Sequence, residues 1–182
     1  GIESQIIAAF VNFEWILSEK TKLVTGIRGE KVNYEYETNI EPGTKGRIQV
    51  SPNRDDDFTE FSPKLAINHK INDELAIFAN YSRGNRAPQT TDLYRIQSKQ
   101  IPGGAKSEKL DSLEIGLRGN FSIFNLELVG FNMRKENYFF RDSQGFNVEN
   151  GKTTHRGFEI NFLAEFNQFF QIENSTSFAE HE

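Results

Sequence analysis

The stretch FSPKLAINHKINDELAIFANYSRGNRAPQTTDLY, residues 61–94, carries the clearest strand pattern of this chain. Two runs within it alternate with a period of two, so successive side chains point to opposite faces of a strand. One face takes Leu65, Ile67, Leu75, Ile77, Ala79 and Tyr81, and the other takes Lys64, Ala66, Asn68, Ala76, Phe78, Asn80 and Ser82. Between the runs, Ile71-Asn72-Asp73-Glu74 has the chemistry of a tight turn. The stretch therefore predicts a β-hairpin followed by a loop that opens on Arg86-Ala87-Pro88.

The same alternation recurs on both sides of this hairpin. Further strands are predicted at residues 6–17, 23–36, 112–121, 126–135, 156–166 and 170–178, which makes eight in all. The faces of the strand at 126–135 stay unassigned, because Gly130 and Asn132 interrupt its alternation. Val, Ile, Thr, Tyr and Phe favour strands over helices in these segments. The chain is therefore predicted to be all-β.

The connections between the predicted strands alternate between short and long. Short turns fall near Ser18, Asn72, Ser122 and Asn167, and long loops span residues 38–58, 84–110 and 136–153. In an up-and-down meander alternate connections lie at the same end, so all the turns would lie at one end and all the loops at the other. This asymmetry is typical of outer-membrane barrels.

The length and the faces of the strands favour a membrane environment. The strands span about 10–16 residues, and a membrane-spanning strand needs roughly 9–11. No run of about 18 apolar residues is present, which excludes a transmembrane helix but leaves a barrel open. We therefore predict an antiparallel up-and-down transmembrane β-barrel whose uncharged face contacts lipid, with Trp15 at an interface. The lumen-facing wall would carry Glu30, Lys64, Glu114, Arg118 and Glu159.

Two other architectures would produce the same alternation. A soluble antiparallel sandwich is one, although its strands are shorter and its turns more regularly spaced. A closed eight-stranded barrel is the other, and its lumen would have to be filled by side chains. The face predicted to point inward is rich in small residues, which suits a wider lumen: Ala8, Gly26, Ala66, Ser82, Gly116 and Gly157.

Composition narrows the function classes. A net charge of −5 argues against a nucleic-acid-binding protein, and the absence of Cys removes disulfides and thiolate metal sites. No Ser-His-Asp order, phosphate loop or carboxylate pair stands out, so we predict that the chain is not an enzyme and holds no cofactor or metal.

An ordered set of short motifs resembles the barrel domain of TonB-dependent outer-membrane receptors. The set comprises SPKL from Ser62, NYSRGNRAP ending at Pro88, DLY from Asp92, SLEIGLR from Ser112 and RGFE from Arg156. Its order and spacing agree with the family over residues 61–178. The resemblance implies a 22-stranded barrel closed by an N-terminal plug, of which residues 1–182 would be a partial barrel of about eight strands without the plug and the C-terminal strands.

The resemblance also implies a function. Such receptors lie in the outer membrane of Gram-negative bacteria, bind a scarce substrate in their external loops and import it with energy from the TonB complex, which acts through the plug. The substrate class is a ferric siderophore, haem, cobalamin or a glycan, and an iron chelate such as a ferric siderophore is the leading expectation. The alternative is a small outer-membrane or soluble β-domain with a structural or adhesive role.

Candidate ligand contacts lie in the predicted external loops. Guanidinium and phenol groups suit carboxylate- or catecholate-rich ligands, which selects Arg83, Arg86, Tyr94 and Arg95. Gln97, in the same loop, is the fifth candidate. For Arg86 we favour a loop-anchoring role, paired with an inward carboxylate such as Glu114. The run Asp55-Asp56-Asp57 lacks EF-hand spacing, so a solvated acidic loop is favoured over a Ca²⁺ site. His69 falls on the lipid-side parity near a turn, where an interfacial role is expected.

Overall fold

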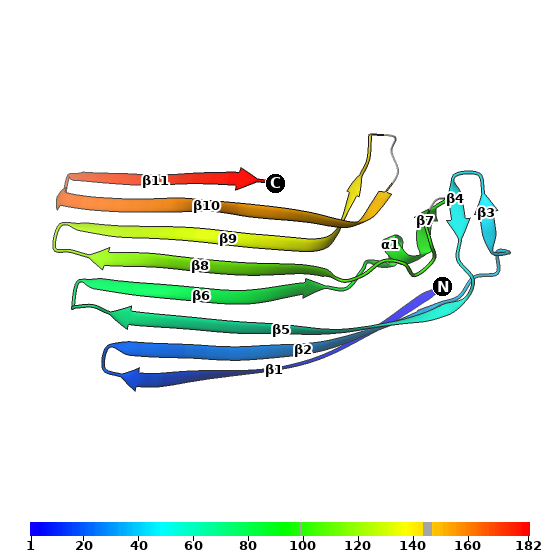
Figure 1. Cartoon of the computed structure of the whole chain (residues 1–182), viewed down its shortest axis with the longest axis horizontal. Coiled ribbons are helices and arrows are strands. Elements are labelled where there is room, and N and C mark those ends of the chain that lie inside the picture. Colours follow the sequence, from blue (N-terminus) through cyan, green and yellow to red (C-terminus); the bar gives the residue numbers. More distant parts are fainter. Residues whose placement is uncertain (99, 144–146) are drawn as a thin grey trace.

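Eight antiparallel strands form one sheet in the computed structural model, which describes residues 1–98, 100–143 and 147–182 (Figure 1). In spatial order they are β1 (Ile2–Ser18), β2 (Thr21–Tyr36), β5 (Arg54–Lys70), β6 (Leu75–Arg86), β8 (Glu108–Asn120), β9 (Phe124–Arg141), β10 (Asn147–Asn167) and β11 (Phe170–His181). Neighbours along the chain are neighbours in the sheet, which confirms the up-and-down meander. β1 and β11 form the two edges, so the described strands make an open sheet and not a closed eight-stranded barrel.

The connections segregate to the two ends of the sheet, as Figure 1 shows. The four tight turns lie together at one end, and Asn72 closes one of them by accepting hydrogen bonds from the backbone amides of Glu74 and Leu75 at 3.0 and 2.8 Å. At the other end, residues 37–53 connect β2 to β5, and residues 87–107 connect β6 to β8. The predicted asymmetry is therefore confirmed for these two connections.

The prediction of a third long loop at residues 136–153 was wrong. β9 and β10 continue through most of it as a paired extension, in which Phe140 lies opposite Val148 and Tyr138 opposite Gly151. Irregular pairing accompanies the positive φ angles of Asn137 (59°) and Asn150 (65°). The polar composition of these residues suggested a loop. The two backbones nevertheless pair here, because backbone hydrogen bonds between strands do not depend on apolar side chains.

One face of the sheet, which we call the polar face, carries the charged side chains of the strand segments toward the tight turns. Directly paired residues on neighbouring strands share a face, and Asn80 pairs with both Ala66 and Glu114. Following such pairs across the sheet places the five predicted wall residues on this one face: Glu30, Lys64, Glu114, Arg118 and Glu159. Arg118 pairs with Glu127 and lies over the Phe78 ring, 5.3 Å from its centroid.

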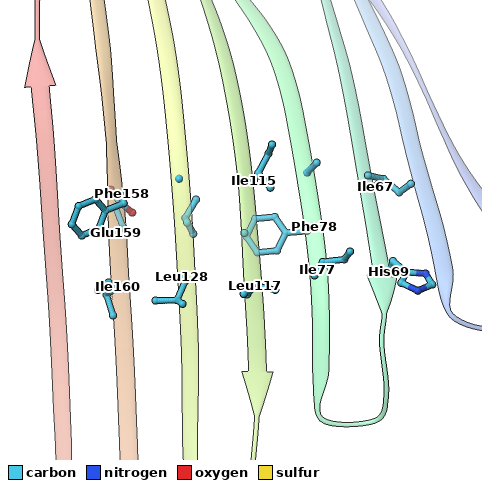
Figure 2. Close-up of a pocket in the computed structure, with 14 residues that line it drawn as sticks. Ile67, His69, Ile77, Phe78, Ile115, Leu117, Leu128, Phe158, Glu159 and Ile160 are labelled. Carbon is cyan, nitrogen blue, oxygen red and sulfur yellow. The ribbon is translucent and has the colours of Figure 1, made fainter.

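The opposite face, which we call the apolar face, carries large hydrophobic side chains that nothing in the described chain covers. One row across the sheet runs from Ile77 through Leu117 and Leu128 to Ile160 (Figure 2). The next row contains Ala79 and Gly130, whose small size leaves a hollow of about 540 Å³ between larger neighbours. Gly130 thus belongs to the apolar face, which resolves the strand whose faces the sequence left unassigned. Apolar patches of this extent mark surfaces that contact a partner or a membrane.

Two glycines of the polar face are covered by aromatic rings. Phe78 lies over Gly116 and Phe131 over Gly157, in the positions a Cβ atom would need. From the sequence, a wide lumen accounts for the small residues of this face. For Gly116 and Gly157 there is a second reason, because an aromatic ring can pack this closely over a sheet residue only where that residue has no side chain.

We expect Gly157→Ala to destabilise the sheet by about 1–3 kcal/mol, the usual cost of overpacking. The added Cβ would meet the carbonyl oxygen of Phe178 as well as the Phe131 ring. Gly130→Ala is the matched control, since its Cβ would find its nearest neighbour 3.9 Å away. Guanidinium unfolding of the full-length protein in lipid vesicles compares the two; equal midpoints would contradict the packing described here.

Candidate ligand-binding site

The two long connections fold together into one unit, which we call the loop subdomain (residues 37–53, 87–98 and 100–107). The first connection supplies β3 (Gly43–Lys45) and β4 (Ile48–Val50), and the second supplies α1 (Thr90–Tyr94) and β7 (Arg95–Gln97). β3, β4 and β7 form a second sheet in that order. The sequence predicted these connections only as long loops, and part of their predicted bounds was wrong. Residues 54–58, 84–86 and 108–110 belong to β5, β6 and β8. No helix in the described residues is long and apolar enough to cross a membrane.

An aromatic core attaches the loop subdomain to the main sheet. Leu93 is fully buried beside Tyr94 and Ala105, and the residues packed around them are Tyr34, Tyr36, Phe58 and Phe139. The rings of Tyr36 and Tyr94 stack with their centroids 4.5 Å apart. Tyr36 pairs with Arg54, and its parity in β2 matches that of Glu30. The loop subdomain therefore folds over the polar face and leaves the apolar face open.

A partly buried ion pair contributes to this attachment. Arg54 donates from Nε and an Nη atom to the two carboxylate oxygens of Asp56, at 2.7 and 2.5 Å, and from its other Nη to the carbonyl oxygen of Pro102 at 2.7 Å. The Tyr94 hydroxyl donates to the same carboxylate at 2.9 Å. Burial, reinforced by this hydrogen bond, raises the pKa of the Tyr94 phenol above its ordinary value.

The acidic run is part of a strand and not a solvated loop. Because side chains alternate along β5, Asp56 points to the polar face while Asp55 and Asp57 point to the opposite side. Asp57 lies 3.8 Å from Lys31. The three carboxylates cannot converge on one cation, and the described residues contain no group of three or more His, Asp or Glu arranged for a metal ion.

Arg83 and Arg86 point to different faces. Arg83 forms two hydrogen bonds with Asp111, at 2.8 and 3.0 Å, and Asp111 also accepts from the Tyr81 hydroxyl at 2.7 Å. Tyr81 and Arg83 share the parity of the apolar face. Arg86 lies on the polar face and pairs with Glu108 at 2.9 Å. The expected ion pair of Arg86 therefore exists, but its partner is Glu108, the residue directly opposite in the register, and not Glu114.

The other three ligand candidates belong to the loop subdomain. Tyr94 is only 4% exposed and holds the attachment described above. The backbone of Arg95 pairs with Val50, while the Arg95 side chain lies outside the described part of the structure. The backbone amide of Gln97 donates to Oε1 of Gln100 at 2.8 Å. The structure thus brings Tyr94, Arg95 and Gln97 into one unit, whereas Arg83 lies on β6 of the main sheet.

A groove of about 480 Å³ opens on the loop subdomain. Its lining is mainly aromatic and aliphatic, with two polar side chains: Tyr36, Ile40, Ile48, Gln49, Val50, Thr91 and Tyr94. Ile40 and Ile48 are each 58% exposed. Of these residues the sequence selected only Tyr94. A usable signal for the rest was the presence of isoleucines in an otherwise polar loop.

The chain is similar to a known family of barrels over nearly its whole length. The family model described as TonB dependent receptor-like, beta-barrel, matches residues 1–180. A comparison with curated proteins found no match.

Solved structures share the fold at low sequence identity. They include a copper transporter, OprC (TM-score 0.76, 18% identity), and the ferric-catecholate import receptor Fiu from E. coli K12 (TM-score 0.74, 17% identity). The ferripyoverdine receptor of the outer membrane of Pseudomonas aeruginosa follows at a TM-score of 0.72 and 15% identity. The matches cover 98%, 99% and 99% of this chain but only 29%, 28% and 23% of the respective structures. The chain therefore spans less than a third of the length of each.

Proposed function

The chain belongs to the β-barrel domain of the TonB-dependent receptors, and from this premise we propose that it is part of an active importer of a scarce substrate, most simply a ferric siderophore. The family consists of transporters in the outer membrane of Gram-negative bacteria and not of enzymes. The family match over residues 1–180 is the observation that carries this proposal. In the whole receptor the remaining strands would close the barrel, and TonB would supply energy through a plug domain.

The two faces of the sheet support an orientation in the membrane. The apolar face contacts lipid, and its hollow around Gly130 accepts acyl chains instead of a transported substrate. The polar face, with Glu30, Lys64, Glu114, Arg118 and Glu159, lines the lumen and faces the plug. In this orientation the tight turns are periplasmic, and the loop subdomain stands over the outer mouth of the lumen.

The groove of the loop subdomain is our candidate for ligand contact. Its aromatic and aliphatic lining with two polar groups has the character of small-molecule sites. Tyr94 forms its floor, and Arg95 and Gln97 follow directly in β7. Arg86 already has a carboxylate partner and serves as an anchor of the loop end, and Arg83 belongs to the outer rim.

We expect the double substitution Ile40→Asp and Ile48→Asp to weaken ligand binding by at least about tenfold. Each lost apolar contact contributes roughly 1–2 kcal/mol to the binding free energy, and about 1.4 kcal/mol corresponds to a tenfold change in Kd. Ile101→Asp is the matched control, since Ile101 is 74% exposed but does not line the groove. Titration of the full-length receptor with ferric siderophores of catecholate, hydroxamate and mixed type measures the affinities. An equal loss in the control would move the site away from this groove.

Uptake by cells tests the function as a whole. Cells that express the full-length receptor should accumulate radioactive iron from at least one ferric siderophore, and accumulation should stop when TonB is deleted. Binding without TonB-dependent uptake would contradict active import. A receptor that binds none of the iron chelates but takes up haem, cobalamin or a glycan would overturn the siderophore assignment alone.

A further inference from the structure

Two histidines face each other on the polar face, apart from the groove. His155 of β10 and His181 of β11 lie directly opposite in the register. Their Nδ1 atoms are 2.5 Å apart, and the ring centroids are separated by 4.7 Å. Two nitrogen atoms at this distance cannot both carry a proton. At least one imidazole therefore directs a lone pair at the other ring.

A hydroxyl group orients the first of these rings. The Nε2 atom of His155 lies 3.0 Å from Oγ1 of Thr153. When Nε2–H donates to this oxygen, Nδ1 of His155 is left unprotonated and points at His181. Histidines that bind metal ions commonly donate from the second nitrogen to a carboxylate, a backbone carbonyl or water, which fixes the tautomer and the ring orientation, and the Thr153 hydroxyl can serve in the same way.

A thioether occupies the next position on the same face. Met133 of β9, the only methionine of the chain, is the direct partner of His155. Side chains paired in this way have Cβ atoms about 4.5–5.5 Å apart, within reach of a flexible methionine. Met133, His155 and His181 therefore form one row across three neighbouring strands.

We propose that His155, His181 and Met133 bind one transition-metal ion, with copper the ion whose preferences fit best. Imidazole nitrogen suits copper, zinc and nickel, and a thioether favours copper, especially Cu⁺. Hard cations such as Ca²⁺ need six to eight oxygen ligands, which this row does not provide. The nearest carboxylates on β11, Glu180 and Glu182, are paired with Arg156.

The site needs only a small opening to accept an ion. Two imidazole nitrogens bound at about 2.0–2.1 Å in tetrahedral geometry lie about 3.3 Å from each other. A small rotation, mainly of the His181 ring, would widen the present 2.5 Å separation to about that distance. The ring of His181 is exposed and has room to rotate, while His155 is half-buried and lies against the Thr153 hydroxyl. A water molecule would complete the coordination.

Cu²⁺ titration of the purified full-length receptor in detergent tests this site, independently of siderophore uptake. We expect electron paramagnetic resonance to show one Cu²⁺ ion coupled to two imidazole nitrogens. His155→Gln or His181→Gln should lower the affinity by at least about tenfold, the lower end of the loss caused by removing even an outer-shell partner. Met133→Leu should weaken Cu⁺ binding but leave Ni²⁺ binding unchanged.

The third histidine of the chain supplies the control. His69 lies on the apolar face, next to Thr21 and far from this row, so His69→Gln should leave Cu²⁺ affinity unchanged. A readout without variants is protection from diethyl pyrocarbonate, read by mass spectrometry. Cu²⁺ should protect His155 and His181 but not His69. Unchanged affinity in both variants of the pair, or no selective protection of the wild-type receptor, would overturn the proposal.

Discussion

Ile115→Arg is expected to destabilise the full-length receptor in a bilayer by about 2–4 kcal/mol, the cost of an arginine on the lipid face near the membrane midplane. Ile115 is 60% exposed in the sheet and lies on the apolar face between Ala79 and Gly130. It is five residues from Asn120 at the turn end. With about 3.3 Å per residue and a tilt of roughly 45°, this places it about 12 Å from that end, near the middle of an apolar band about 25 Å tall.

The neighbouring residue supplies the control for this prediction. Glu114→Arg introduces the same side chain one position away, on the polar face, where water can reach it. We expect it to cost much less, mainly through the weak 3.5 Å contact with Asn80. Guanidinium unfolding in lipid vesicles measures both, with Ile115→Ala reporting the loss of side-chain volume alone. Equal costs for the two arginines would contradict the assignment of the faces.

Tyr94→Ala is expected to destabilise the loop subdomain by about 3–5 kcal/mol, the range for removing a large buried aromatic side chain. The substitution removes the ring stacked on Tyr36 and leaves a cavity beside Leu93. The substitution also removes the hydrogen bond that the Tyr94 hydroxyl donates to Asp56, so Asp56 keeps only its bonds to Arg54. The eight-stranded sheet should survive, since Tyr94 belongs to a connection and to none of the long strands.

Limited proteolysis of the full-length receptor measures this effect. Tyr94→Ala should accelerate cleavage within residues 37–53 and 87–107 while the barrel stays resistant. Tyr94→Phe keeps the ring and removes only the hydroxyl, so its cost should be about 1.5–3 kcal/mol, the range for a hydrogen bond to a charged group. Thr91→Ala, on the exposed side of the same helix, is the matched control. Cleavage rates like those of the wild type in Tyr94→Ala would show that the two connections do not form one cooperative unit.

The strands and their faces could be predicted from the sequence, because a period of two is a local signal. Leu65 and Ile67 alternate with Lys64 and Ala66 whatever the rest of the chain does. The register then carries the same parity across the sheet, which is why the five charged wall residues share a face. The small residue Gly130 obscured the signal in only one strand.

The loop subdomain could not be predicted, because its contacts join residues far apart in the sequence. Tyr94 binds Asp56 across 38 positions, and Arg54 binds the carbonyl of Pro102 across 48. Its strands are three residues long, too short to show a period. The partner of Arg86 was missed for a related reason, since choosing Glu108 over Glu114 requires the register of β6 and β8.

Site-directed spin labelling at positions 114 and 115 tests whether the apolar face contacts lipid and the polar face lines a water-filled lumen. The chain contains no cysteine, so Glu114→Cys and Ile115→Cys each introduce a single label site into it. In the full-length receptor in vesicles, the label at 115 should be relaxed by oxygen, which dissolves in lipid, and the label at 114 by a water-soluble nickel chelate. The reverse pattern, or equal access of the nickel chelate to both positions, would contradict the account.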